Sequence, residues 1–160
     1  MSDGTDWPAE PAERVRELIE GVLDELDLEG DVGIEEDEER ISASIEGDED
    51  YGLLIGKRGQ TIDALQLLCF QAAFRGMRER KRVVVDAAGY RERRREKLTA
   101  RADRAAEEAL SAEHRVTMEA MSAQERRVVH EHLKERAGVE TYSEGDEPNR
   151  CVVVAPLVAE

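Results

Sequence analysis

The most informative residues of the chain form a short turn with glycine at both ends and two basic residues between them. The Gly-x-x-Gly motif and its apolar neighbours are Ile55, Gly56, Lys57, Arg58, Gly59 and Ile62. Glycine has no Cβ, so such a turn lets backbone N–H groups approach a ligand closely. The helix expected after the turn adds free N–H donors and a partial positive charge at its N-terminus. Together with the charges of Lys57 and Arg58, these groups predict a clamp for a phosphate backbone.

The spacing of this motif excludes a nucleotide-triphosphate loop. Such a loop needs four residues between its glycines, followed by Lys and Ser or Thr. Here only Lys57 and Arg58 lie between the glycines, and Gln60 and Thr61 follow. The motif is therefore better suited to a polymer backbone than to a triphosphate.

A second set of chemically capable residues lies in the last third of the chain. Arg126 and His130 are four residues apart, so a helix would put them on one face, about a turn from each other. Val129 and Leu133 supply an apolar stripe beside them. A histidine at such a border is usually structural and bonded to a nearby strand, so a structural and a ligand-binding interpretation of His130 both stand at this point.

The elements that must hold the first motif can be read from the apolar spacing around it. Residues at helical spacing predict a helix that begins near Pro11 and ends before Gly30. Alternating apolar residues over 32–34 and 41–45, on either side of an acidic turn at 37–39, predict a β-hairpin. These elements precede the glycine motif.

Three further elements surround the motif itself. A short helical turn is expected over 53–55, and a long amphipathic helix over 62–76. The apolar run 83–85 predicts a short strand that is buried on both faces.

A third long helix is expected over 90–110. Its inner face is predicted to consist of Leu98, Ala102, Ala105, Ala106 and Ala109. Arginine and lysine crowd the rest of that helix. Ser122 and Glu125 form a capping box that starts a fourth helix, and Gly138 is its expected C-terminal stop. Three short strands accompany this helix, over 116–118, 139–143 and 151–155.

The formal net charge of −15 looks unsuitable for a nucleic-acid binder, but it is unevenly distributed. Residues 1–50 hold 20 acidic and three basic side chains, a net of −17, whereas residues 51–160 hold 18 acidic and 20 basic, a net of +2. Within residues 75–104 there are 12 basic and five acidic side chains. A polyanionic partner would therefore meet the middle of the chain and be repelled by its front.

The remaining composition narrows the class of protein. Aromatic residues make up only 4%, which argues against a sheet that stacks RNA bases on aromatic rings. The sequence shows neither a run of the ~20 apolar residues that span a membrane nor a signal peptide. Cys69 and Cys151 are expected to be buried free thiols, which fits a reducing cytoplasm.

The order helix, strand, strand, short helix, Gly-x-x-Gly, helix, strand resembles the bacterial-type (type II) KH domain over residues 10–87, after an acidic tail at 1–9. The resemblance implies that Gly56, Lys57, Arg58 and Gly59 contact the backbone of about four unpaired nucleotides. It also implies an apolar groove that reads base edges. Ile55 and Ile62 would flank that groove, although both fit a plain core position equally well.

The second motif resembles the domain named for its Arg-x-x-x-His signature, a binder of single-stranded nucleic acid, over residues 88–160. Besides Arg126 and His130, the positions that carry this resemblance or follow it at fixed offsets are Arg127, Thr141, Ser143, Gly145, Pro148 and Arg150. The resemblance implies that the residues other than glycine and proline bind nucleic acid. We expect Arg126 to contact phosphate directly with little effect on stability, and His130 mainly to position the surface.

Both domains in this order resemble the bacterial Jag family, also called KhpB. The fold implied is α+β, with helices on a small three-stranded sheet in the second domain. Because only a short tail precedes the first predicted helix, we expect the chain to lack the N-terminal domain of many relatives. The resemblance implies RNA binding, post-transcriptional control linked to cell elongation and division, and a small single-KH protein as a partner.

Two functions therefore compete. The first is non-catalytic binding of single-stranded RNA by tandem modules in the cytoplasm. The second is an assembly protein that pairs with another KH protein and for which RNA contact is incidental. An enzyme is disfavoured, because no set of metal ligands and no pair of nucleophile and base can be assigned in the sequence. We expect no cofactor, metal, membrane or small-molecule substrate.

Overall fold

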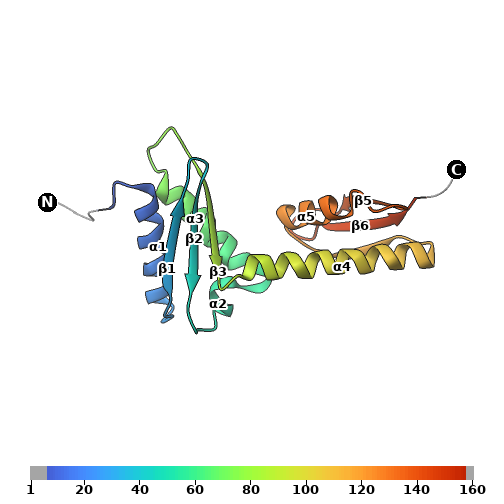
Figure 1. Cartoon of the computed structure of the whole chain (residues 1–160), viewed down its shortest axis with the longest axis horizontal. Helices are drawn as coiled ribbons and strands as arrows, with labels where there is room; N and C mark the ends of the chain where they lie inside the picture. The colour runs from blue at the N-terminus through green and yellow to red at the C-terminus, as the bar shows by residue number, and fades with distance from the viewer. Residues whose placement is uncertain (1–6, 158–160) are drawn as a thin grey trace. The chain divides into compact units, whose positions relative to one another are not determined.

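The computed structural model describes residues 7–157. The chain divides after Tyr90 into two compact units, unit 1 (Met1–Tyr90) and unit 2 (Arg91–Glu160). Figure 1 shows the helices and strands of both units. Most of the expected acidic tail at 1–9 lies outside the described residues. The fold is of the α+β class.

Unit 1 has the expected order of helices and strands. Its elements are α1 (Pro11–Glu25), β1 (Asp31–Glu36), β2 (Arg40–Glu46), α2 (Gly52–Ile55), the 3₁₀ turn η1 (Lys57–Gly59), α3 (Gln60–Ala73) and β3 (Arg82–Ala87). The sheet order is β1-β2-β3, with β1 antiparallel and β3 parallel to β2. Helix α3 ends at Ala73, three residues before the predicted end at residue 76.

The acidic turn between β1 and β2 is held by its own aspartate. Asp37 Oδ1 accepts hydrogen bonds from the backbone N–H groups of Glu39 and Arg40, each at 2.8 Å. These bonds hold the pKa of the Asp37 carboxyl below its usual value. The carboxylate therefore replaces a backbone partner, which explains why a run of acidic residues makes a tight hairpin turn.

The core of unit 1 lies between the sheet and two helices. Val15, Ile19 and Leu23 of α1 and Ile62 and Leu65 of α3 pack against one face of the sheet. That face carries the buried strand residues, which are Ile41, Ala43, Ile45, Val83, Val85 and Ala87.

The apolar run of strand β3 predicted burial on both faces, and the structure contradicts this prediction. Its burial alternates, so Val83 and Val85 are buried whereas Val84 is only partly covered. The reason is that both long helices of unit 1 lie on the same face of the sheet. Strand β3 is also an edge strand, and Gln66 of α3 reaches it: Gln66 Oε1 accepts a hydrogen bond from the Val85 N–H at 3.0 Å.

Unit 2 contains two helices and a second three-stranded sheet. Its elements are α4 (Tyr90–Ala112), β4 (Val116–Ala120), α5 (Ala123–Leu133), β5 (Val139–Glu144) and β6 (Cys151–Pro156). The sheet is antiparallel in the order β4-β6-β5. The expected inner face of α4 is confirmed, because Leu98, Ala102, Ala105, Ala106 and Ala109 are all buried.

Gly138 does not end a helix, which corrects the sequence prediction. Helix α5 already ends at Leu133, and Gly138 has a φ of 84° directly before β5. Its carbonyl accepts the Leu157 N–H at 2.7 Å. The left-handed glycine therefore turns the chain into β5 rather than out of α5.

Candidate nucleic-acid interface

The Gly-x-x-Gly turn joins α2 to α3 through an unusual backbone. Gly56, Arg58 and Gly59 have positive φ values of 73°, 54° and 77°. A Cβ added to Gly56 would lie 2.8 Å from the Thr61 Cβ, and one added to Gly59 would lie 2.8 Å from the Tyr90 ring. Both glycines are therefore required by backbone conformation and by close contact.

The element before the turn is anchored in unit 1. Tyr51, at the start of α2, is buried, and its hydroxyl donates to the Glu29 carbonyl at 2.7 Å. Leu54 of the same helix is buried as well. With α2 fixed in this way and Ile62 of α3 in the core, the turn is held between two anchored helices.

The two basic residues of the turn differ in exposure. Lys57 is exposed, as expected, but Arg58 is half-buried rather than fully solvent-exposed. Ile62 is fully buried, so of its two interpretations the core position is the one observed. Ile55 is half-buried at the edge of the same core. Lys57 is thus the more accessible charge of the turn.

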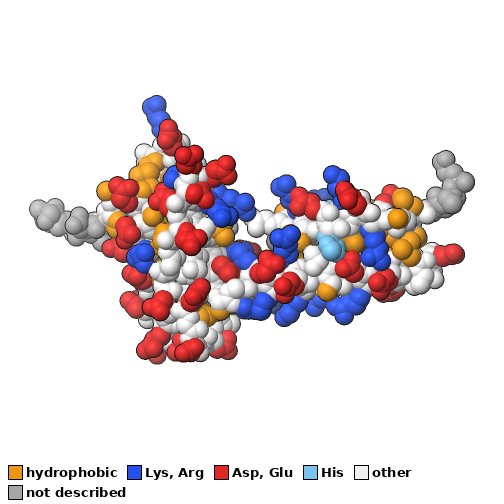
Figure 2. Space-filling view, in the orientation of Figure 1, with side chains coloured by type: hydrophobic (Ala, Val, Ile, Leu, Met, Phe, Trp, Pro, Cys, Tyr) orange, Lys and Arg blue, Asp and Glu red, His pale blue; other side chains and the backbone are white. Residues whose placement is uncertain are grey.

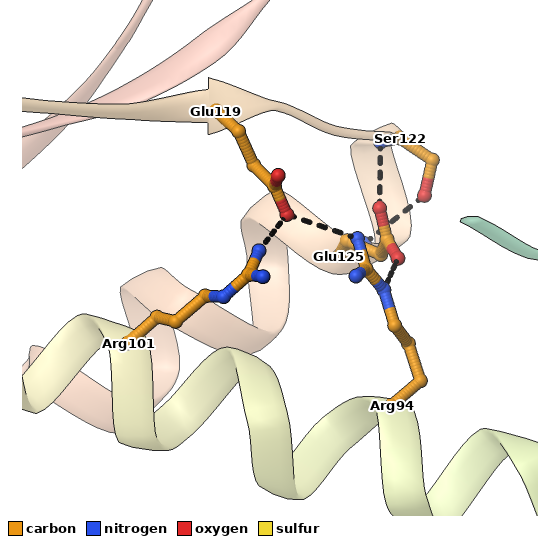
Figure 3. A network of polar contacts seen from close by, with 5 residues as sticks. All are labelled: Arg94, Arg101, Glu119, Ser122 and Glu125. Atoms are coloured by element: carbon orange, nitrogen blue, oxygen red, sulfur yellow. Dashed lines mark hydrogen bonds and ion pairs between the residues drawn. The ribbon is translucent and has the colours of Figure 1, made fainter. Parts of the chain in front are cut away.

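In unit 2 the start of α5 is fixed by its capping box. The Glu125 N–H donates to Ser122 Oγ at 3.3 Å, and Glu125 Oε2 accepts the Ser122 N–H at 3.1 Å. Arg94 of α4 donates from Nε to Glu125 Oε1 at 2.6 Å, and Glu119 of β4 bridges Arg94 and Arg101 (Figure 3). One glutamate therefore caps α5 and ties it to α4.

Arg126 is buried, with 9% of its side chain exposed. Its Nη1 donates to the Met121 carbonyl at 2.9 Å, and its Nη2 pairs with Glu147 Oε1 at 2.7 Å. The sequence predicts a phosphate contact with little effect on stability, and the burial of this guanidinium contradicts the second half of that prediction. Arg126 links the start of α5 to the β5–β6 turn.

His130 is bonded to the neighbouring strand, as a structural interpretation of it requires. Its Nδ1 lies 2.7 Å from Thr141 Oγ1, and its Nε2 lies 3.0 Å from Ser143 Oγ. Alternate residues of β5 face α5, which is why both hydroxyls reach one imidazole. Burial, with a smaller contribution from the Arg126 charge, lowers the pKa of His130. The ring is therefore neutral at neutral pH.

The structure brings only part of the second predicted site together. We call Arg126, His130, Thr141 and Ser143 the α5–β5 cluster. Arg127 is exposed and pairs with Glu131 at 2.8 Å, and Arg150 is exposed directly before β6. Sequence reasoning missed Glu147 and Arg94, because both partners lie far along the chain from the residues they hold.

Within residues 7–157, no group of three His, Cys, Asp or Glu side chains is arranged to hold a metal ion, and no helix is long and apolar enough to cross a membrane. Burial raises the pKa of the Cys69 thiol to about 12. Cys151 is only half-buried, contrary to expectation, and its Sγ faces the Glu144 carbonyl.

Comparison with known protein families identifies a domain in each half of the chain. Residues 12–86 match the KH domain of KhpA/KhpB, and residues 96–156 match the domain named for the Arg-x-x-x-His signature. The RNA-binding protein KhpB of Bacillus subtilis is 32% identical over 148 residues, which cover 91% of this chain and 71% of the relative. The chain belongs to the KhpB family.

Two further relatives show how much of a family member this chain represents. RNA-binding protein KhpB of Clostridium symbiosum is 37% identical over 141 residues, covering 87% of this chain and 63% of the relative. The protein of the same name from Streptococcus pneumoniae is 32% identical, and the match covers 43% of it. The chain thus spans less than two thirds of some relatives, and the shared part contains the KH and Arg-x-x-x-His domains.

Proposed function

We propose that this chain binds single-stranded RNA without catalysing a reaction. In this proposal residues 10–87 act as a KH domain and residues 88–160 as an Arg-x-x-x-His domain. The observation that carries it is the backbone of the Gly-x-x-Gly turn, whose positive φ values and close contacts leave no room for a side chain at either glycine. The names of the relatives, RNA-binding proteins, support the choice of ligand.

The chemistry of the turn favours a backbone contact over base recognition. Lys57 is exposed, and the turn leads directly into the N-terminus of α3, where free N–H groups attract anions. Neither feature distinguishes one base from another. Phosphate contacts position a strand rather than select its sequence.

The part of the α5–β5 cluster formed by Thr141 and Ser143 is the second proposed contact. Its Thr141 and Ser143 hydroxyls are held by His130, and exposed Arg127 and Arg150 lie in the same unit. Two weak sites on one chain raise each other's effective concentration, so neither needs high affinity alone. Post-transcriptional control linked to cell elongation and division, in the cytoplasm, is the process that we propose for this binding.

The test of the clamp is Lys57→Asp combined with Arg58→Asp. We expect RNA affinity to fall by about tenfold or more, because two cations become anions beside the phosphate path. The salt dependence should also flatten, by about 0.7 in slope for each phosphate of a single strand that is no longer neutralised. A labelled single-stranded RNA is titrated at two salt concentrations, and circular dichroism checks the fold.

The matched control is Arg75→Asp with Arg78→Asp. Both arginines are exposed in the same unit, and the variant changes the net charge by the same amount. Equal reductions of affinity in the two variants would mean that overall charge, and not the turn, determines binding.

A second candidate function is assembly with a protein partner, which we propose to be a small single-KH protein. Leu67 and Leu68 of α3 are 58% and 56% exposed, and apolar surface of this kind is a common feature of protein interfaces. Leu67→Ser with Leu68→Ser should abolish capture of such a partner and leave RNA affinity unchanged. Capture that disappears on nuclease treatment, and is unaffected by these substitutions, would contradict the assembly function.

A further inference from the structure

Helix α4 has charges of opposite sign on two flanks. Asp103 and Glu107 contact the end of α5 and the segment after it: Asp103 Oδ1 lies 3.0 Å from His132 Nε2 and 3.5 Å from Arg136, and Glu107 lies 3.8 Å from Arg136. The other flank carries Arg93, Lys97, Arg101 and Arg104. These residues are spaced by four, four and three positions, so they form one row along the helix.

This basic row is accessible. Lys97, Arg101 and Arg104 are all exposed. Figure 2 shows Lys and Arg side chains gathered along the lower side of α4. A step of four residues advances about 6 Å along a helix, which is of the order of the separation of neighbouring phosphates in an extended strand.

A groove runs beside the row, between α4 and β4. It has a volume of about 300 Å³ and is lined by Arg101, Arg104, Ala105, Glu108, Val116, Met118 and Glu119. Ala105, Val116 and Met118 give it an apolar floor, and the arginines form its rim. Strand β4 is an edge strand, paired only with β6, so this side of the sheet is not covered by another strand of residues 7–157.

The lining holds two basic and two acidic side chains, and the positive charge on this side of α4 comes from the row of Lys97, Arg101 and Arg104. Glu119 carries a negative charge, but its carboxylate already pairs with Arg94 at 3.5 Å and with Arg101. Glu108, the other acidic side chain of the lining, lies 3.9 Å from His114, which offsets its charge only when the imidazole is protonated. Among residues 7–157, neither of the exposed side chains Lys97 and Arg104 forms an ion pair.

We propose that the α4–β4 groove is a third RNA contact, in which Lys97 and Arg104 hold phosphates and the apolar floor takes one unpaired base. The proposal rests on the proposed function and adds a subsite to it. An apolar floor beside a row of cations suits a nucleotide, because every nucleotide joins a flat stacking face to an anionic phosphate. A duplex is disfavoured, because its bases are paired and stacked inside it.

The first arm of the test measures affinity for a short oligouridine RNA with the full chain. Lys97→Glu and Arg104→Glu should each lower the affinity about fivefold to tenfold and flatten the salt slope by about 0.7. Lys134→Glu is the control for Lys97→Glu: Lys134 is exposed in the same unit, and the substitution changes the charge by the same amount. Equal effects of the two lysine variants would overturn the proposal.

The second arm locates the base by NMR of methyl groups. On RNA addition the methyl signals of Ala105, Val116 and Met118 should shift, while that of the core residue Leu98 should not. Shifts that follow protein concentration without RNA would identify a second copy of the chain as the occupant and overturn the proposal. RNA binding with no shift at Met118 and normal affinity of Lys97→Glu would remove this subsite alone, whereas no RNA binding by the unaltered chain would remove the proposed function as well.

Discussion

Arg126 is the residue whose environment differs most from what its motif suggested. The side chain donates to the Met121 carbonyl and pairs with Glu147, and it is nearly inaccessible to solvent. An arginine in this position holds two segments of backbone together. A phosphate could reach it only if Glu147, whose side chain is 57% exposed, moved away.

Arg126→Ala should therefore destabilise unit 2. Removal of the guanidinium leaves the buried Met121 carbonyl without its donor, so we expect a loss of about 1–3 kcal/mol in the free energy of unfolding. Denaturant titration measures this loss, with Arg127→Ala as the control, because Arg127 is exposed and should change stability by less than about 0.5 kcal/mol. If the Arg126→Ala chain were as stable as the control, the structural role of Arg126 would be contradicted and only a ligand-binding role would be left.

His130 makes the stability of unit 2 depend on pH. Its pKa in the folded chain lies below the ordinary value of about 6.5, so the unfolded chain binds the proton more readily. The stabilisation by neutral His130 is thus present above that ordinary value and is lost as the pH falls below it. Unfolding at pH 7.5 and pH 5.5 should show a smaller loss on acidification for His130→Gln than for the unaltered chain. An equal loss in both chains would assign the pH dependence to other groups.

At the scale of elements, a comparison of two left-handed glycines distinguishes the cost of backbone strain from the cost of a steric clash. Gly59 and Gly76 have almost the same φ, 77° and 76°. A Cβ on Gly59 would meet the Tyr90 ring at 2.8 Å, whereas one on Gly76 would meet nothing within 4 Å. The two positions therefore share the strain of a left-handed backbone and differ in the space around it.

Gly76→Ala should cost about 1 kcal/mol of stability, the penalty for a left-handed alanine. Gly59→Ala should cost clearly more, because Tyr90 must also move. Thermal unfolding of both variants measures the difference, and Gly59→Ala should weaken RNA binding in addition. Equal destabilisation would mean that Tyr90 yields without cost and that the close contact is unimportant.

The capping box was predictable from sequence because it is local. Ser122 and Glu125 are three residues apart, and the structure contains both of their reciprocal bonds. The bond from Arg94 to Glu125 spans 31 positions, and no periodicity marks it. The sequence also could not show that both long helices of unit 1 cover the same face of the sheet, so it overestimated the burial of Val84.

For the whole molecule, the order of elements was predictable and the use of individual polar residues was not. The helical and strand periodicities reproduce both units, because apolar spacing is a property of each segment alone. Whether Arg126 is buried, or whether Lys97 borders a groove, depends on which segments pack together. The distribution of charge shows the same difference. The net charge of −17 in residues 1–50 can be counted in the sequence. That the acidic flank of α4 contacts α5 and its basic flank borders β4 is known only from the structure.

The hydrogen bond from Val85 to Gln66 has a consequence for the behaviour of the protein at high concentration. Strand β3 ends its sheet, and the unpaired N–H groups of such a strand are a template for another chain. One of these donors is already occupied by the Gln66 side chain. A strand from a second chain would have to displace that side chain before it could pair with β3. The Gln66 side chain therefore disfavours the repeated strand addition from which fibrils grow.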